Sequence, residues 1–288
     1  MAAGRPAIEF RGASPHLARS TVSRQPIRRS MPELPEVEHA VRALRRVVSG
    51  RVIADVALLH PSLRRRVPAR VARALAGATI TGVERRGKHQ LIHLADGRVL
   101  HAHFRMTGDW LVAPPGAPLP RFARAVFMLD DGRRVVLEDS RALATLDVHP
   151  AGAPLRLALG VEPMDAALTP HLLHELLVRR RGPIKPVLLD QRVIAGLGNI
   201  YVAEALWRAR VSPLARASSL SRDRLERLIA AIRVVISRAT GSRYTAIGAA
   251  RLNVYDREGL ACRRCGARVR RVVQAGRSTY FCPACQRR

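Results

Sequence analysis

The sequence predicts an α+β protein with a strand-rich first part, a helical second part and a small cysteine-bearing unit at the end. Two Asp-Gly pairs, each flanked by segments of β character, indicate antiparallel hairpins in the first part. After about residue 155, apolar residues recur at helical spacing instead. All four cysteines lie within residues 261–288. A chain of 288 residues is long enough for about two ordinary domains.

The first thirty residues differ in composition from the rest. They hold six Arg and one Glu, are rich in Ser, and contain no apolar stretch of the kind found in a secretory signal. Their composition is similar to that of a transit peptide, but an ordered pattern begins directly after Met31, which favours a misassigned start. Residues 1–31 are therefore expected to be a leader, either untranslated or removed.

The first domain is predicted to open with a helix and to continue as strands. From Glu36 to Val48 apolar residues recur at helical spacing, and Gly50 follows as a stop signal. The expected strands are residues 52–59, 78–83, 89–94, 98–104, 125–129 and 133–137, with a proline-rich loop at 113–120.

The second domain is predicted to be helical. Helices are expected at residues 169–179, 186–193 and 200–208. One further helix has an apolar face made of Leu225, Leu228, Ile229, Ile232 and Ile236. No stretch approaches the ~18 uninterrupted apolar residues of a membrane span, so no membrane anchor is expected.

Charge indicates the class of partner. Fifty Lys and Arg against 22 Asp and Glu give a formal charge of +28, and such a field attracts polyanions, nucleic acid above all. Only two of the basic residues are lysines, Lys88 and Lys185. Coding bias toward Arg can explain this scarcity. Alternatively, Lys remains only where a compact ammonium is needed and a planar guanidinium would not fit.

The four cysteines have the spacing of a metal site. Cys262 and Cys265 form one C-x2-C pair, and Cys282 and Cys285 form another after sixteen intervening residues, which is typical of a four-thiolate zinc site. Two disulfides or four incidental thiols are the alternatives, but the paired spacing in a chain without a secretion signal favours metal. Four thiolates leave no open position, so one Zn2+ would be structural. It would hold a hairpin with Arg277 near the turn, placed for phosphate contact or simply solvated.

A glycine-rich turn precedes one of the predicted helices. Gly196-Leu197-Gly198 leads into Asn199, which is a candidate N-cap. Glycines let another backbone approach closely, and the free N–H groups of a helix N-terminus favour an anion. A tight connection is the simpler interpretation, but in so basic a chain we favour phosphate binding.

The run Pro32-Glu33-Leu34-Pro35-Glu36-Val37-Glu38, directly after Met31, resembles the mature start of the formamidopyrimidine-DNA glycosylase family. The resemblance continues in the family's order with RRGK at 85–88, H-x-x-M-[ST]-G at 103–108, IKPVLLD at 184–190, GLGNIY at 196–201 and the cysteine unit. It implies an N-terminal antiparallel β-sandwich with an N-terminal helix (32–154), a helical domain with a helix–two-turns–helix element (155–256) and a zinc-finger hairpin (257–288).

The resemblance also implies an activity. Such a base-excision repair enzyme removes oxidised bases, including 8-oxoguanine and formamidopyrimidines, from double-stranded DNA and then cuts the abasic site. Pro32 matches the nucleophile, Glu33 the acid/base and Lys88 the lysine that reaches the lesion, while Asn199 and Arg277 match phosphate clamps. The other positions expected at the DNA are Arg141, Met106, Leu143, Lys185 and His103. A monomeric, bacterial-type, cytoplasmic protein associated with the nucleoid is expected, without a small-molecule cofactor.

The chemistry requires a free Pro32. A secondary α-amine titrates near ~7.7–8.0, against ~10.4 for lysine, so part of it is neutral at physiological pH. Its attack on C1′ would expel the base and give an iminium that drives β- and then δ-elimination, with Glu33 protonating the opening sugar ring. With residues 1–31 attached, the Pro32 nitrogen is a tertiary amide and cannot attack.

Two segments depart from the family. Its intercalation loop usually reads DPRRFG, and this chain has DSRALA at 139–144. Arg141, which would face the orphaned base, is kept, whereas Leu143 replaces the aromatic wedge. Met106 would fill the space left by the flipped nucleotide. The segment between Thr240 and Asp256 is shorter than the usual lesion-capping loop, so a broader preference that includes oxidised pyrimidines and plain abasic sites is compatible with the sequence.

Two other functional classes fit part of the sequence. A non-catalytic, zinc-containing DNA-binding or architectural protein would explain the charge and the cysteines, but not Pro32-Glu33 after a Met. An RNA-binding or ribosome-associated protein is less favoured, because 4% aromatic residues offer few stacking platforms. His93, His101 and His103 alternate along predicted strands, and we assign them no metal, since exposed histidines on a sheet face are commoner than ligands.

Overall fold

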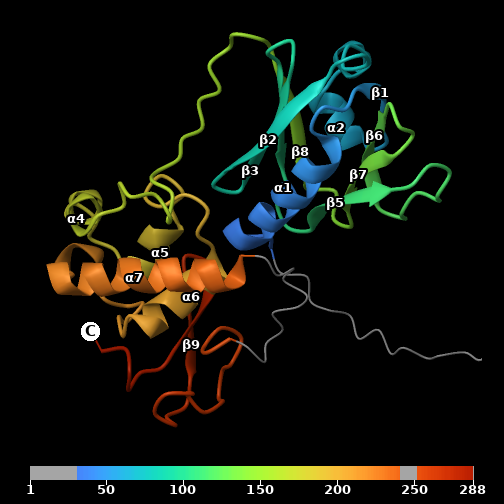
Figure 1. Ribbon diagram of the computed structural model, residues 1–288. Coiled ribbons are helices and arrows are strands. Elements are labelled where there is room, and N and C mark those ends of the chain that lie inside the picture. Colours follow the sequence, from blue (N-terminus) through green and yellow to red (C-terminus); the bar gives the residue numbers. More distant parts are fainter. Residues whose placement is uncertain (1–30, 241–251, 288) are drawn as a thin grey trace, which may run out of the picture.

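The computed structural model describes residues 31–240 and 252–287 (Figure 1). The predicted leader before Met31 and most of the shortened capping loop lie outside these residues. A strand-rich part and a helical part lie side by side, and the chain crosses between them once in a long extended segment around residue 155 (Figure 1).

The strand-rich part is a sandwich of two four-stranded antiparallel sheets, as predicted. One sheet has the order β1-β6-β7-β5 and the other the order β2-β3-β4-β8. The strands are β1 (Ile53–Leu58), β2 (Ile80–Arg86), β3 (His89–Leu94), β4 (Val99–His103), β5 (Gly108–Ala113), β6 (Ala123–Leu129), β7 (Arg134–Asp139) and β8 (Thr145–His149). Inward-facing aliphatic and aromatic side chains of both sheets form one core, which the apolar face of helix α1 (Leu34–Val48) completes.

The sequence missed four short elements of this part. Strands β5 and β8 were not predicted, and β8 has only one fully buried residue, Leu146, so its alternation is weak. Helices α2 (Pro61–Arg66) and α3 (Ala69–Arg73) were missed as well, because each buries a single side chain and offers no periodic face. They close the sandwich beside β1 and β8.

The helical part contains α4 (Pro170–Leu177), α5 (Ile184–Leu189), α6 (Asn199–Arg208), the 3-10 turn η1 (Ala217–Ser219) and α7 (Arg222–Ala239). Helix α5 begins two residues before the predicted 186–193, directly after its N-cap Pro183. It also ends earlier than predicted, because the backbone is already extended at Asp190. The hairpin β9 (Arg270–Gln274) and β10 (Arg277–Phe281) follows, and a small core that includes Trp207 of α6 joins it to the helices. None of the helices in residues 31–240 and 252–287 is long and apolar enough to cross a membrane.

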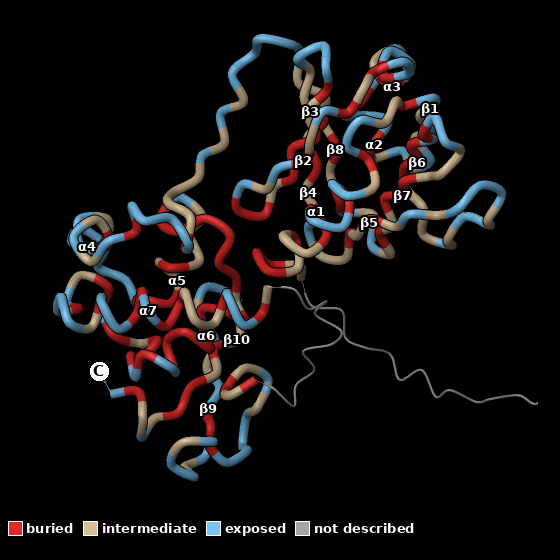
Figure 2. Tube along the Cα trace, viewed as in Figure 1, coloured by how far each residue is buried: buried red, intermediate tan, exposed pale blue. Residues whose placement is uncertain are grey.

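Helix α1 links the two parts. Most of its apolar face packs in the sandwich, whereas Leu34, in its first turn, belongs to the core of the helical part. Figure 2 shows this first turn buried where the two parts meet. Pro32 and Glu33, just before the helix, are thereby fixed at the boundary between the two domains.

Candidate active site at the domain boundary

Glu33 binds the N-terminus of helix α6. Its two carboxylate oxygens accept hydrogen bonds from the backbone N–H groups of Ile200 (3.0 Å) and Tyr201 (3.3 Å). The turn before α6 therefore binds an anion, as its glycines suggested, but the anion is a carboxylate of the same chain. The prediction that these N–H groups hold a phosphate is wrong, because Glu33 already occupies them.

The two glycines of the turn make room for this contact. A Cβ at Gly198 would lie 2.1 Å from the carboxyl carbon of Glu33, and one at Gly196 would lie 2.5 Å from the side chain of Leu34. Gly196 also has φ +84°, which other residues rarely adopt, and its carbonyl accepts a hydrogen bond from the Leu34 N–H at 3.1 Å. The sequence thus correctly predicted a close backbone approach at this turn.

Charged groups converge on Glu33. The side chain is only 3% exposed, and its pKa is raised because burial outweighs the opposing effects of Lys88, the two backbone N–H groups and Arg277. A raised pKa favours the protonated form of Glu33 relative to an exposed carboxyl group. The structure therefore brings three of the predicted site residues, Glu33, Lys88 and Arg277, into one electrostatic neighbourhood beside Pro32.

Glu36 adds a second buried carboxyl to the site. One oxygen accepts a hydrogen bond from the Glu33 backbone N–H at 3.0 Å, and the other accepts one from the Tyr201 hydroxyl. Burial raises the pKa of Glu36 to about 7, although the Tyr201 hydrogen bond opposes the shift and the neighbouring Glu33 adds to it. In the sequence, Glu36 stood out only as part of the run from Pro32 to Glu38.

An ion-pair network fixes the turn that carries Lys88. Arg85 contacts Glu38 of α1 (2.7 Å) and Glu162 of the interdomain segment (2.8 Å). The Gly87 N–H donates to the same Glu162 carboxylate at 2.6 Å. The β2–β3 turn is thus tied to both neighbouring segments directly beside Lys88.

Lys185 is buried beside Asn199 and the start of β10. It is 1% exposed, and its ammonium donates to Asn199 Oδ1 (2.6 Å), to the Ser278 carbonyl (2.9 Å) and to Thr279 Oγ1 (2.7 Å). All three N–H groups are therefore used inside the protein. The side chain thus joins α5, α6 and β10, and a DNA contact of Lys185 stays a prediction.

The two predicted phosphate clamps lie next to each other. Asn199 is the first residue of α6 rather than its N-cap, which is Gly198. The Asn199 side chain donates to the carbonyl of Ser278 at 3.1 Å, and Ser278 follows Arg277 at the start of β10. Arg277 itself is exposed. Their contact with phosphate remains a prediction.

Asp139 organises the predicted wedge loop. Its buried carboxylate accepts hydrogen bonds from the backbone N–H groups of Arg141 (3.1 Å), Leu143 (2.6 Å) and Ala144 (2.7 Å), and from the Thr107 hydroxyl. The loop is held in a turn that leaves Arg141 exposed and Leu143 44% exposed. Thr107 follows Met106 in the chain, so one carboxylate ties together the two loops predicted to enter the DNA.

The histidines form a row along neighbouring strands of one sheet. His89 Nδ1 and His101 Nε2 lie 2.8 Å apart, and His103 Nδ1 accepts the Arg105 N–H at 2.9 Å. Burial lowers the pKa of His89 to about 4 and that of His103 to about 3. Within the described part of the chain, the four cysteines are the group that brings three or more metal-ligating side chains together. A DNA contact of His103 stays a prediction.

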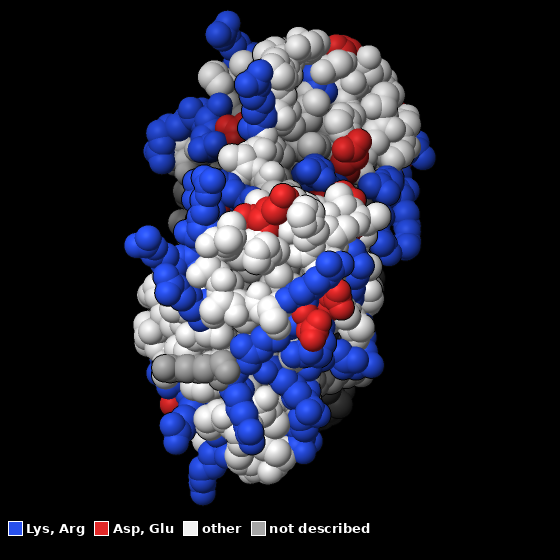
Figure 3. Space-filling model, turned by 90° about the vertical axis from the view of Figure 1, so that its left-hand side faces the viewer, with Lys and Arg blue, Asp and Glu red and all other residues white. Residues whose placement is uncertain are grey.

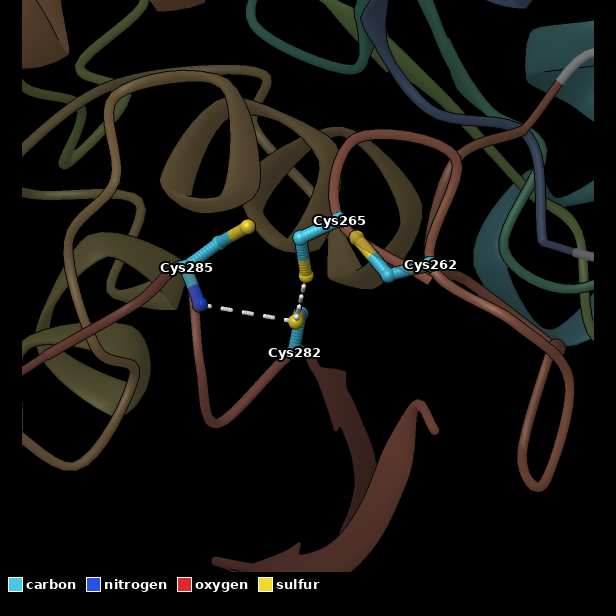
Figure 4. Close-up of side chains that lie close together, drawn as sticks. All are labelled: Cys262, Cys265, Cys282 and Cys285. Carbon is cyan, nitrogen blue, oxygen red and sulfur yellow. Dashed lines mark hydrogen bonds between the residues drawn. The ribbon is translucent and has the colours of Figure 1, made fainter. Parts of the chain in front are cut away.

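The cysteines fit a zinc site. The four sulfur atoms lie within 4.8 Å of one another (Figure 4), close to the about 3.8 Å edge of a tetrahedron with Zn–S bonds of about 2.3 Å. Two come from the loop before β9, and two follow β10. The Trp207 indole N–H donates to Cys262 Sγ at 3.4 Å, and Arg264 lies over the Trp207 ring at 4.1 Å. The site joins the hairpin to α6.

Basic side chains cover the face shown in Figure 3 from one end to the other, with few acidic ones between them. This distribution agrees with a formal charge of +28 that is not confined to the leader. A surface of this kind attracts the phosphate backbone of nucleic acid whatever its sequence.

Comparison with known proteins identifies the family. The Formamidopyrimidine-DNA glycosylase N-terminal domain matches residues 31–146, the Formamidopyrimidine-DNA glycosylase H2TH domain matches 159–249, and a zinc finger found in FPG and IleRS matches 259–288. A Formamidopyrimidine-DNA glycosylase of Chloroflexus aurantiacus is 40% identical over 271 residues, covering 89% of this chain and 98% of the relative. The chain belongs to the formamidopyrimidine-DNA glycosylase family.

Solved structures of this family have the same fold. The Lactococcus lactis enzyme, bound non-covalently to DNA with an AP site, aligns with a TM-score of 0.83 and 31% identity, covering 89% of this chain and all of that one. MutM in complex with DNA containing carbocyclic 8-oxo-G aligns with a TM-score of 0.82 and 29% identity over the same shares. The predicted sandwich, helix–two-turns–helix region and zinc finger are thus confirmed.

The sequence of this glycosylase-family chain did not reveal three residues that shape the site. Glu162 and Asp139 lie outside the residues assigned a role, and each acts by accepting backbone N–H groups from a loop. Tyr201 was noted only as part of GLGNIY, although its hydroxyl binds Glu36. A buried acid beside a turn is a weak signal in a single sequence, because its partners are backbone atoms.

Proposed function

We propose that this protein is a base-excision repair DNA glycosylase with abasic-site lyase activity, acting through Pro32 as the nucleophile. It removes oxidised purines, including 8-oxoguanine and formamidopyrimidines, from double-stranded DNA and then cuts the strand by β,δ-elimination. The observation that carries this proposal is the binding of the Glu33 carboxyl group by the N-terminus of α6. A buried acid with a raised pKa is held by the N-terminus of α6 directly beside Pro32, at the boundary of two domains.

The nucleophile requires release of Pro32 from Met31. Once free, the Pro32 amine attacks C1′, and the C1′–N bond to the damaged base breaks as the new C1′–N bond forms. The first product is an aminal in which C1′ still carries the ring oxygen. Protonation of O4′ and cleavage of the C1′–O4′ bond open the ring and give an iminium, which remains cationic because a secondary amine has no second proton to lose. This cation accepts the electron pair left when the C2′ proton departs and the 3′-phosphate is expelled.

Glu33 supplies the proton for ring opening. Its raised pKa favours the protonated form of the carboxyl, and the same group takes up a proton after transfer. The two N–H groups of α6 stabilise the carboxylate form that follows. They also fix its position relative to the reacting carbon.

DNA lies in the cleft between the domains with the damaged nucleotide flipped out, because C1′ is shielded while the base is stacked. Met106, Arg141 and Leu143 enter the space it leaves. Asn199 and Arg277 bind the phosphates that flank the flipped nucleotide, and Lys88 reaches the lesion. One structural Zn2+ on Cys262, Cys265, Cys282 and Cys285 holds the hairpin that carries Arg277.

Each of the three successive domains carries a different part of the proposed activity. Residues 32–154 carry the nucleophile and the wedge, residues 155–256 the helices that seat Glu33, and residues 257–288 the zinc finger. The bacterial relatives support a cytoplasmic, nucleoid-associated protein. The smaller Leu143 wedge favours a broad lesion range that includes oxidised pyrimidines.

Borohydride trapping tests the proposal. Protein that begins at Pro32 is mixed with duplexes carrying 8-oxoguanine or an abasic site, and a covalent adduct is expected on both. Pro32→Gly should lose excision of 8-oxoguanine. Glu33→Gln should stop excision while binding to a duplex with a tetrahydrofuran abasic analogue stays intact. No adduct from protein proven to begin at Pro32 would leave a zinc-bearing DNA-binding protein as the better interpretation.

A further inference from the structure

The outer face of the sheet β2-β3-β4-β8 carries a row of four histidines, namely His103, His89, His101 and His149. Successive ring centroids along the row are 4.8, 5.0 and 5.5 Å apart. Leu100 and Ala102, which alternate with the histidines along β4, belong to the sandwich core, so the row faces away from that core. His103 pairs with the first residue of β8, and His149 is the last. The row therefore crosses the sheet from the end at the wedge loop to the opposite end.

Hydrogen bonds connect three of these rings. His89 Nδ1 lies 2.8 Å from His101 Nε2, and His101 Nδ1 lies 3.4 Å from His149 Nε2. A neutral imidazole has one donor and one acceptor nitrogen, so in the neutral row only one of the two end nitrogens, His89 Nε2 or His149 Nδ1, carries a proton. One added proton makes both end nitrogens donors. Among the described residues neither end nitrogen has a partner and neither is enclosed, so both are open to a ligand.

The surroundings keep the row neutral in the free protein and attract an anion to it. Burial lowers the pKa of His89, and its neighbours His101, Arg105 and Lys88 add to the effect. Burial likewise lowers the pKa of His101, where His149 and Arg66 act in the same direction and Asp147 opposes them. Cationic side chains thus flank the row near both of its ends.

The acidic groups beside the row have basic partners. The remaining charged or titratable groups on these strands and next to them are Glu84, Arg86, His93, Asp147 and, from the interdomain segment, Glu162. Asp147 contacts Arg66 at 2.6 Å, Glu84 contacts His93 at 3.4 Å, and Glu162 contacts Arg85 at 2.8 Å. The local charge therefore favours an external anion at the row.

We propose that His89, His101 and His149 bind the phosphate backbone of the DNA duplex beside the lesion and take up one proton when they bind it. The inference rests on the proposed function, because it requires the lesion to lie in the cleft at which the row begins. A protonated row offers phosphate oxygens two N–H donors and one positive charge, whereas a neutral row offers one donor and no charge.

Proton uptake fixes the sign of the pH dependence. A phosphate against the row stabilises the protonated form, so the pKa of His101 is higher in the complex than in the free protein. Between these two values, binding takes up one proton, and the affinity rises by up to about tenfold for each unit by which the pH falls. Above both values the row stays neutral, and its contribution no longer depends on pH.

Arginines continue the basic surface beyond the row. Arg66, which binds Asp147 beside His101, belongs to α2, and α2 packs against β8. Residues 61–73 contain no acid and five exposed arginines, which are Arg64, Arg65, Arg66, Arg70 and Arg73. Helix α3 lies at the end of the strand-rich part that is far from the helical part (Figure 2). A backbone that follows the row therefore meets basic groups from the cleft to the far end of the sandwich.

The experiment compares matched glutamine variants as the pH changes, because Gln keeps a polar side chain but takes up no proton. His101→Gln removes the middle of the row. His171→Gln is the control, since it changes a histidine of α4 whose side chain is 80% exposed. Affinity for a tetrahydrofuran duplex is measured with protein beginning at Pro32, between about pH 8 and about pH 5.5 at constant ionic strength. His149→Gln is a second test variant, and thermal unfolding reports whether each variant folds.

The expected result is a ratio of affinities that changes with pH. The affinity of the unmodified protein relative to His101→Gln should be close to one at the upper pH and should rise by up to about tenfold for each unit as the pH falls. Glu36 and His103 are present in both proteins, so their effects cancel in this ratio. The corresponding ratio for His171→Gln should not change with pH.

The outcomes separate this inference from the proposed function. Borohydride trapping on an abasic-site duplex should persist in His101→Gln at saturating protein, because the row touches no reacting atom. A ratio that stays constant with pH for both His101→Gln and His149→Gln, with the folds intact, would overturn the histidine inference alone. Loss of trapping by His101→Gln only would also overturn it, since the row would then belong to catalysis. Absence of an adduct from the unmodified protein would overturn the proposed function instead.

Discussion

The contact between Glu33 and the N-terminus of α6 can be tested by adding a single methyl group at Gly198. In Gly198→Ala, the new Cβ would lie 2.1 Å from the Glu33 carboxyl carbon and 2.4 Å from its Oε1 atom. Ordinary van der Waals contact begins at 3.4 Å, so the carboxyl group must move by about 1.3 Å or the α6 turn must shift by as much. The backbone of Gly198, with φ −133° and ψ −172°, is extended and suits alanine. The substitution therefore acts through the side-chain contact and not through backbone strain.

The displacement predicts a loss of excision with little loss of DNA binding. A misplacement of about 1 Å in a reacting group costs on the order of 100-fold in rate. The N–H groups of Ile200 and Tyr201 would also lose a charged acceptor, a change of about 1.5–3 kcal/mol for each hydrogen bond. Single-turnover excision of 8-oxoguanine by protein beginning at Pro32 should fall by about 100-fold.

A matched glycine provides the control. Gly182 has an ordinary φ, and a Cβ added there would meet no atom within 4 Å, so Gly182→Ala should leave excision unchanged. Thermal unfolding and affinity for a tetrahydrofuran duplex report whether the fold and the cleft persist in both variants. If Gly198→Ala excises 8-oxoguanine at a rate within a few-fold of the wild-type rate, while thermal unfolding and duplex affinity are unchanged, the contact between Glu33 and the N-terminus of α6 has no role in excision.

Three further predictions concern the wedge, the buried carboxyls and the zinc finger. Asp139→Asn replaces one of two accepting oxygens with a donor group, so the wedge loop should loosen and the protein should lose about 2 kcal/mol of stability, measured by denaturant unfolding. Glu36 binds its proton more tightly when folded, with a pKa of about 7 against 4.5, so stability should fall as the pH rises from 4.5 to 7, by on the order of 3 kcal/mol. Glu36→Gln should flatten that slope, and an unchanged slope would remove Glu36 as its source. Cys262→Ser should release zinc and weaken binding of the tetrahydrofuran duplex, and a metal-free variant with unchanged affinity would rule out the hairpin as a clamp.

Local signals predicted much of the fold. The Asp-Gly turns at Asp96 and Asp131 fixed two hairpins, because the turn chemistry and the flanking alternation act within a few residues. Strands β5 and β8 escaped prediction because their partners lie far along the chain. Strand β5 pairs with β7, and β8 pairs with β4. Packing against these partner strands, rather than local β-propensity, stabilises each segment as a strand.

The candidate site was only partly readable from the sequence. The identities of Pro32, Glu33 and the four cysteines follow from short motifs whose chemistry is local. The partner of the α6 N-terminus does not, because Glu33 is 167 residues from Ile200 and any anion would satisfy those N–H groups. Lys88 and Lys185 illustrate the same limit. Both stand out by composition, but the acceptors of Lys185 on α6 and β10 are distant in the sequence and became evident only in the structure.

The arrangement of the site makes catalysis dependent on the contact between the domains. Pro32 and Glu33 precede a helix of the sandwich, yet the groups that seat Glu33 belong to α6, and Leu34 is buried in the helical core. Separation of the domains would expose Glu33 to water and remove its two N–H donors. Burial is the main cause of its raised pKa, so exposure to water would lower the pKa toward that of an ordinary glutamate. The contact between the domains therefore maintains both the burial of Glu33 and its two N–H donors, which together set the position and the pKa of the acid.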